Sequence, residues 1–133
     1  MSLTDLAFSE TFRTAALTEL RDLIDAGAGA GRLLYYGAAT PESDTYYLMG
    51  TATLTDPCGT LSAGVLTLEI ATQVSSALTE GHLAYADLTD SDFTVHATLP
   101  IVESNVPVPG TLAMPNRHVI AEAPIYLLSL TIG

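Results

Sequence analysis

The sequence contains no lysine and no tryptophan, and its four Lys+Arg positions are therefore all arginine. Against these stand 15 acidic residues, which give a formal net charge of -11 at neutral pH. Such a surface repels a phosphate backbone, because nucleic-acid binding depends on cationic side chains that displace counterions. We therefore expect no nucleic-acid partner. A salt-adapted host would produce the same acidic bias.

Cysteine is almost absent as well, since Cys58 is the only one. A single cysteine cannot form an intramolecular disulfide, so the fold must be held without such a cross-link. A domain of 133 residues can do this, because it buries roughly two-thirds of the surface of its unfolded chain. We expect one domain over residues 1–133, folded in a reducing cytoplasm, with Cys58 as a structural residue in a turn.

Long apolar runs are also missing. No run approaches the roughly 18 residues that suggest a membrane-spanning helix. Residues 1–10 hold two acidic side chains, no basic one and no long apolar core, so they are not expected to act as a secretory signal. We expect no membrane partner.

Apolar residues at helical spacing predict one amphipathic helix near the N-terminus, over residues 5–26. These apolar residues are Phe12, Ala16, Leu20, Leu23 and Ile24. Ser9 is the expected N-cap, with Phe8 before it. The Gly-Ala-Gly-Ala-Gly run at 27–31 is expected to end the helix and to form a flexible joint.

The rest of the chain predicts short strands separated by turns. The expected strands are residues 32–37, 46–55, 64–72, 81–88, 92–98, 117–122 and 125–132. Threonine is abundant, and its β-branched side chain suits the solvent-facing side of a sheet. The predicted fold class is mainly β, an antiparallel β-sandwich or barrel of jelly-roll-like type with one N-terminal α-helix.

The clearest β signal lies in residues 48–70, which predict a hairpin. Leucine and alanine alternate with threonine on both sides of the segment, the period-two pattern of strands with one buried face. Asp56 and Pro57 are expected to open the turn because proline fixes φ. Gly59 and Gly64 are expected to take positions of positive φ.

Five of the seven prolines fall between residues 100 and 124, so this region cannot be a central paired strand throughout. It is expected to be an extended loop or arm. The ordinary interpretation is an ordered surface loop, and the alternative is an arm that grips a neighbouring subunit. The last strand, 125–132, is apolar on both faces and should be central or covered, because a bare edge of that kind would aggregate.

Metal sites have little support in the sequence. A hairpin that turned at residues 89–91 would place His82 and His96 diagonally on one face, but two ligands do not make a zinc site. His118 has still less context. Asp87, Asp90 and Asp92 surround the same turn, where Asp and Ser are ordinary turn residues, and the calcium-loop pattern is missing.

Catalytic motifs are missing too. The Gly-x-Ser-x-Gly elbow and the phosphate-loop and dinucleotide patterns are absent, so we expect no enzyme, no catalytic residue, no cofactor and no metal. The sequence leaves open a pair of carboxylates that would hydrolyse glycosides. Without tryptophan a sugar-stacking platform is reduced, although tyrosines remain, which we interpret as packing and interface residues. They are Tyr35, Tyr36, Tyr46, Tyr47 and Tyr85.

Several short motifs together resemble a family of small virion structural proteins of tailed bacteriophages. They are the stretch 8–36 with Ile24-Asp25-Ala26-Gly27, the Asp56-Pro57-Cys58-Gly59 turn with Gly64-Val65-Leu66, the strand 81–87 with Asp90-Ser91-Asp92, and the C-terminal Ser129-Leu130-Thr131-Ile132. The likeness covers most of the chain but not residues 100–124.

The resemblance implies a virion component present in many copies, and the acidic charge favours the outer capsid surface. The leading hypothesis is a capsid decoration or cement protein, assembled in the host cytoplasm, which binds the major capsid protein and itself as a homotrimer. A tail tube, tail-tip or neck protein is the alternative, and a carbohydrate-binding or hydrolytic module is the third. The expected contact residues are Phe8, Phe12, Tyr46, Tyr47, Val106, Pro107, Val108, Pro109 and Met114.

Overall fold

The computed structural model describes residues 9–74, 76–106, 111–125 and 129–132. Within these residues the chain forms one helix and eight strands. They are α1 (Glu10–Asp25), β1 (Arg32–Ala38), β2 (Tyr47–Ser62), β3 (Val65–Thr72), β4 (Gly81–Thr89), β5 (Val95–Glu103), β6 (Leu112–Met114), β7 (His118–Val119) and β8 (Ser129–Ile132). In this described part, no helix is long and apolar enough to cross a membrane.

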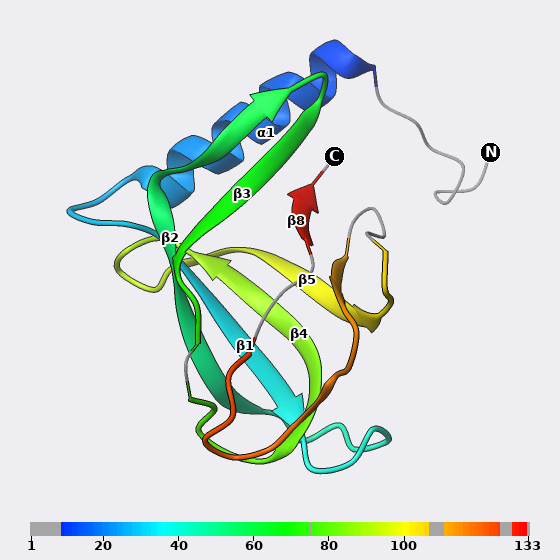
Figure 1. Cartoon of the computed structure of the whole chain (residues 1–133). Helices are drawn as coiled ribbons and strands as arrows, with labels where there is room; N and C mark the ends of the chain where they lie inside the picture. The colour runs from blue at the N-terminus through cyan, green and yellow to red at the C-terminus, as the bar shows by residue number, and fades with distance from the viewer. Residues whose placement is uncertain (1–8, 75, 107–110, 126–128, 133) are drawn as a thin grey trace.

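The strands form one sheet that curls into a nearly closed barrel (Figure 1). Neighbouring strands follow the order β1-β2-β3-β8-β6-β5-β4, and β4 pairs with β1 again, which closes the ring. β7 adds to β4 beside the start of that strand. The pairings are antiparallel except that of β5 with β6, which is parallel. The predicted class, a mainly β barrel or sandwich with one N-terminal helix, is confirmed.

The core fills the inside of this barrel. Leu33 and Tyr35 are fully buried on β1, and Leu66 and Leu68 are buried between exposed neighbours on β3, as the alternating pattern predicted. The hydroxyl of Tyr35 has no hydrogen-bond partner among the described residues, and burial raises the pKa of this phenol. Tyr35 therefore contributes to packing through its ring.

The hairpin turn does not lie where the proline predicted it. The Asp56-Pro57 segment lies inside β2, and β2 and β3 are joined at Ala63 and Gly64, whose φ angles are 51° and 74°. Between the pairs Leu54↔Ile70 and Gly59↔Leu68, β2 carries several more residues than β3, so it bulges. Gly64 takes positive φ as predicted, whereas Gly59 is not among the described residues with positive φ.

The helix lies along this long hairpin at one end of the barrel (Figure 1). Ser9 is its N-cap, as predicted, and its side chain accepts a hydrogen bond from the backbone N–H of Phe12 at 3.1 Å. The helix starts at Glu10; the predicted residues 5–8 lie outside the described part. Leu17 and Ile24 enter the core, and Asp25 Oδ1 accepts the backbone N–H of Cys58 at 2.9 Å.

The proline-rich region contains strands where a loop or arm was predicted. β5 continues through Pro100 to Glu103, and Ile101 pairs with Leu112 of β6. Pro100 lies opposite Tyr85 at the end of the pairing with β4, and the pairing with β6 begins at the next residue. Pro115 directly follows β6. The expected strand 117–122 is reduced to the two residues of β7. Residues 107–110 lie outside the described part.

The last strand was predicted to be central or covered. β8 pairs with β3 on one side and with β6 on the other, so it is central in the sheet. Ile125 makes a separate bridge with Val74, and residues 126–128 of the predicted strand lie outside the described part. The barrel is closed through this strand.

Candidate interaction surface

The candidate metal ligands of the sequence do not form a cluster among the described residues. Among the described residues, no three His, Cys, Asp or Glu side chains lie close enough together to hold a metal ion. The predicted register of the β4–β5 hairpin is wrong, because Asp87 pairs with Thr98 and β5 starts only at Val95. The longer turn between the strands contains Phe93 at φ 65°. His82 and His96 are therefore not brought together.

Each histidine has a different partner instead. His82 stacks on His118, with ring centroids 4.7 Å apart, because β7 pairs with β4 at this position. His118 Nε2 lies 3.2 Å from Glu80 Oε1. His96 Nε2 lies 3.0 Å from Asp90 Oδ2, and both of these side chains are mostly covered. These contacts join neighbouring elements of the barrel wall.

Asp90 organises the turn between β4 and β5. Its Oδ1 accepts the backbone N–H groups of Asp92 and Thr94 at 2.9 and 3.0 Å, the pattern of an Asx turn. The hydrogen bond with His96, followed by these backbone bonds, holds the pKa of the Asp90 carboxyl below its ordinary value of 3.8. The acidic turn is therefore structural, as its Asp and Ser content indicated.

The Asp90→Asn variant should be less stable than the wild type at neutral pH. Asparagine lacks the charged oxygen with which Asp90 forms its hydrogen bond to His96. A carboxyl group whose pKa is lower in the folded than in the unfolded protein stabilises the fold at pH values above its ordinary pKa. This stabilisation is lost as the pH falls through the pKa of the folded state. The difference between wild type and variant should thus shrink below about pH 4. Urea unfolding at several pH values measures it, with Asp92→Asn as the control. A difference that is constant with pH would contradict this assignment.

Cys58 is a core residue. It is fully buried beside Asp25. Burial and the carboxylate of Asp25 together raise the pKa of the Cys58 thiol from 9.0 to about 12. The thiolate, which is the reactive form, is therefore almost absent at neutral pH.

We expect native protein to react with iodoacetamide at pH 8 on the order of a thousandfold more slowly than protein unfolded in urea, because each pKa unit lowers the thiolate fraction about tenfold. Mass spectrometry of the alkylated chain measures both rates. Equal rates in the two states would show that Cys58 is not enclosed as described. The unfolded sample also serves as the reagent control.

The expected contact residues differ in their exposure to solvent. Phe12, Tyr46, Tyr47 and Val106 are 53%, 44%, 41% and 63% exposed, so their surfaces are available for contact. Met114 is only 2% exposed, because β6 lies between β5 and β8 and turns this side chain into the core. The placement of Met114 on an exposed arm is therefore wrong. Phe8, Pro107, Val108 and Pro109 lie outside the described residues.

Exposed apolar side chains are present at both ends of the barrel. At one end α1 lies against the β2–β3 turn (Figure 1). Three exposed residues are called the helix-end set: Phe12 near the start of α1, Leu23 near its end, and Val65 at the start of β3. At the other end lies the connection from β1 to β2 (Figure 1).

The set at that second end, called the loop-end set, consists of Tyr46, Tyr47 and Leu78. Leu78 belongs to it because its backbone N–H donates to the carbonyl of Met49, at the start of β2. It is 68% exposed. Exposed apolar side chains are thus present at both ends of the molecule, and further ones outside the two sets are Phe93, Val95, Val106 and Ile120.

A tyrosine cluster on the outside of the sheet was only partly foreseen. Tyr36 of β1 and Tyr85 of β4 are register partners, and their rings are stacked with centroids 5.1 Å apart. Tyr46 meets Tyr85 edge-on at 5.3 Å. Asp87, two residues along β4, lies on the same side and accepts a hydrogen bond from Thr98 at 2.7 Å. Tyr36, Tyr46, Tyr85 and Asp87 are called the tyrosine face below.

Tyr36 and Tyr85 were not among the expected contact residues. Strand alternation places Tyr36 on the same side of its strand as Leu34, and Tyr85 on the same side as Asp87. The sequence does not show that the two strands pair and bring the rings together. The rings lie on a sheet face and line neither of the two cavities described for this barrel.

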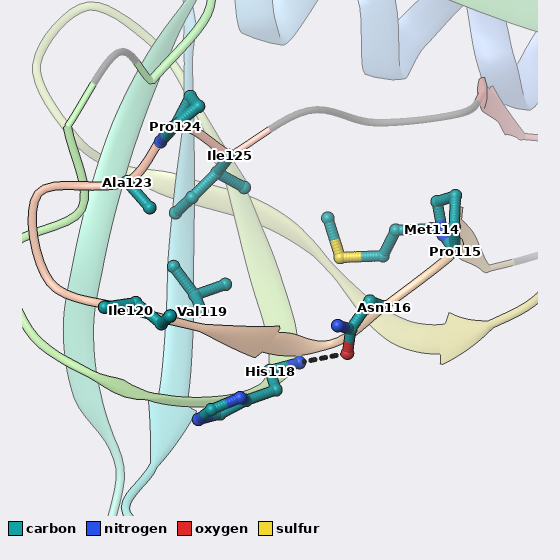
Figure 2. A pocket seen from close by; sticks show the side chains of 9 residues that line it. All are labelled: Met114, Pro115, Asn116, His118, Val119, Ile120, Ala123, Pro124 and Ile125. Carbon is teal, nitrogen blue, oxygen red and sulfur yellow. Dashed lines mark hydrogen bonds between the residues drawn. The ribbon is translucent and has the colours of Figure 1, made fainter.

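One cavity of about 370 Å³ lies beside β7 (Figure 2). Its lining is mostly apolar and includes Met114, Val119 and Ile125 of the core. The polar residues are Asn116, whose side chain accepts the backbone N–H of His118 at 2.9 Å, and His118 itself. Asn116 Oδ1 and His118 Nε2 thus each have a hydrogen-bond partner in the protein.

Comparison with known protein families, characterised proteins and solved structures finds no match to this chain. The likeness to phage virion proteins therefore depends on the short motifs quoted above.

Proposed function

We propose that the chain is a structural protein of a tailed-phage virion, namely a capsid decoration or cement protein that binds the outer capsid surface and bridges neighbouring capsomers. The observation that carries this proposal is the presence of exposed apolar side chains at both ends of one barrel, the helix-end set and the loop-end set. A bridging protein needs two contact surfaces, whereas a catalyst needs a site that concentrates reactive groups.

The bridging mechanism relies on many weak contacts. When one end is bound, the other is held near its partner at an effective concentration of about millimolar, so the pair binds more tightly than either end alone. Symmetric copies, such as a homotrimer on a local threefold axis of the shell, would multiply this effect. The net charge of -11 favours the outer surface, away from packaged DNA.

Copy number and radial position in purified virions test the proposal. A cement protein is expected at hundreds of copies per particle and outside the shell. A dozen copies or fewer would contradict it and favour the tail or neck alternative. A position inside the shell would contradict the charge argument directly.

Binding of purified protein to particles that lack it tests the two surfaces separately. Phe12→Ser changes the helix-end set and Tyr47→Ser the loop-end set, and each should lower occupancy at least about tenfold through lost avidity. Val95→Ser is the control, because Val95 is 49% exposed and belongs to neither set. Particle occupancy is measured by quantitative mass spectrometry. If the control lowers occupancy as much as the two variants, the ends are not the contact surfaces.

A further inference from the structure

We propose that the tyrosine face binds a positively charged, arginine- or lysine-containing segment of a partner protein. It shares Tyr46 with the loop-end set, but the proposal concerns a different surface and a stated ligand chemistry. It is tested on the isolated protein, so its failure would leave the virion proposal standing, and the reverse also holds.

The geometry holds the aromatic rings in place before any ligand arrives. Tyr36 and Tyr85 are stacked with an interplanar angle of 15°, and Tyr46 meets Tyr85 at 80°. Tyr36 and Tyr85 are half-buried on neighbouring strands, while Tyr46 is exposed. Rings that are already ordered lose little conformational entropy on binding, which is why tyrosine is frequent in binding surfaces.

The electrostatics of this face favour a cation. The face of an aromatic ring attracts positive charge, and the carboxylate of Asp87 stands beside the rings. Burial, and next the charge of Asp87, raise the pKa of the Tyr85 phenol, so this phenol stays neutral. With a net charge of -11, the whole molecule steers cations toward its surface.

The protein already uses this chemistry on the same side of β1. Arg32 lies two residues before Leu34 and four before Tyr36, and its guanidinium carbon stands 5.6 Å from the ring centre of Phe93. Arg32 is also hydrogen-bonded to Thr53. Its charge is therefore engaged at Phe93, and Asp87 forms no ion pair with a described residue.

Other occupants fit this face less well. A second copy of the chain, with its own net charge of -11, would be repelled by Asp87 on this face, so the proposed homotrimer would form through other surfaces. A neutral glycan would gain from the rings but not from the charge, and it is usually held in a concave site. A cationic segment uses the rings, the phenol oxygens and the carboxylate together.

The test is an amide NMR titration of the ¹⁵N-labelled protein with the blocked peptide Ac-Arg-Gly-Arg-Gly-NH2. Shift changes should concentrate in β1, in β4 and at the start of β2. Tyr46→Leu and Asp87→Asn should each weaken binding about threefold, in the range expected for exposed cation–aromatic contacts. Tyr46→Phe, which keeps the ring, should stay within about twofold of the wild type.

Glu69→Gln is the matched charge control, since it removes one carboxylate from the exposed side of β3. If it weakens binding as much as Asp87→Asn, the attraction is diffuse and the proposal fails. It also fails if maltotetraose shifts these residues while the peptide does not, or if dilution of the protein alone shifts them, which would indicate a second copy. Tyr46 is exposed, so its variants are expected to fold even if Asp87→Asn does not.

Discussion

The Gly59→Ala variant is expected to be severely destabilised, by about 3 kcal/mol, the upper part of the usual range for overpacked sites. A β-carbon at Gly59 would collide with the carbonyl oxygen of Thr67 and would lie 2.8 Å from the α-carbon of Leu68. These are backbone atoms of β3, so they cannot rotate away as a side chain can. The free energy of unfolding in urea, followed by circular dichroism, measures the effect.

The control for this variant is Gly29→Ala, in the joint after the helix. The nearest side-chain atom to a β-carbon there is Cβ of Ser91 at 3.8 Å, which is ordinary contact. Loss of flexibility in the unfolded chain should make this variant neutral or up to about 1 kcal/mol more stable. If Gly59→Ala were as stable as Gly29→Ala, β2 and β3 would not approach as closely as the structure shows.

The second large effect is expected for Leu88→Ala, with a loss of about 2–5 kcal/mol. Leu88 is fully buried on β4, which pairs with both β1 and β5, so neighbouring strands cannot collapse easily into the cavity. Domains of this kind have a total stability of about 5–15 kcal/mol, so the variant loses a large part of it. Thermal and urea unfolding both measure the change.

Leu78→Ala is the matched control, since it removes the same atoms from a side chain that is 68% exposed. Its stability should stay within about 0.5 kcal/mol of the wild type. A similar loss in both variants would mean that Leu88 does not lie inside the barrel.

The hairpin of β2 and β3 shows which structural features the local sequence can predict and which it cannot. On β3 the alternation of leucine and threonine correctly predicted that Leu66 and Leu68 enter the core, because the period of two is a property of each strand alone. At the start of β2 it did not, since Met49 is fully buried and Leu48 only half-buried. The position of the turn was wrong. Asp56 and Pro57 are common turn residues, but here they form part of a bulge, with Cys58 tied to Asp25 of the helix. That contact joins residues 33 positions apart, which no local pattern reports.

The expected contact residues were also predicted only in part, because their exposure depends on tertiary pairing. Phe12, Tyr46 and Val106 were expected as contact residues and are exposed. The exposure of Phe12 does not follow from the local pattern, which placed it on the apolar face of the helix, whereas the structure buries Leu17 and Ile24. Met114 was expected there too, but pairing of β6 between β5 and β8 buries it. The histidines were paired wrongly because a longer turn moved the register of β5, and a change of register moves every side chain that follows.

The sequence by itself determined the fold class, the capped helix, the alternation of core and surface residues and the strongly acidic charge, since each depends on residues near one another in the chain or on composition. Tertiary structure alone decided where the hairpin turns, how the barrel closes through β8, and which aromatic rings meet on the tyrosine face. These depend on strand register and on contacts between distant residues. Both are selected by the packing of the whole barrel and not by any one segment.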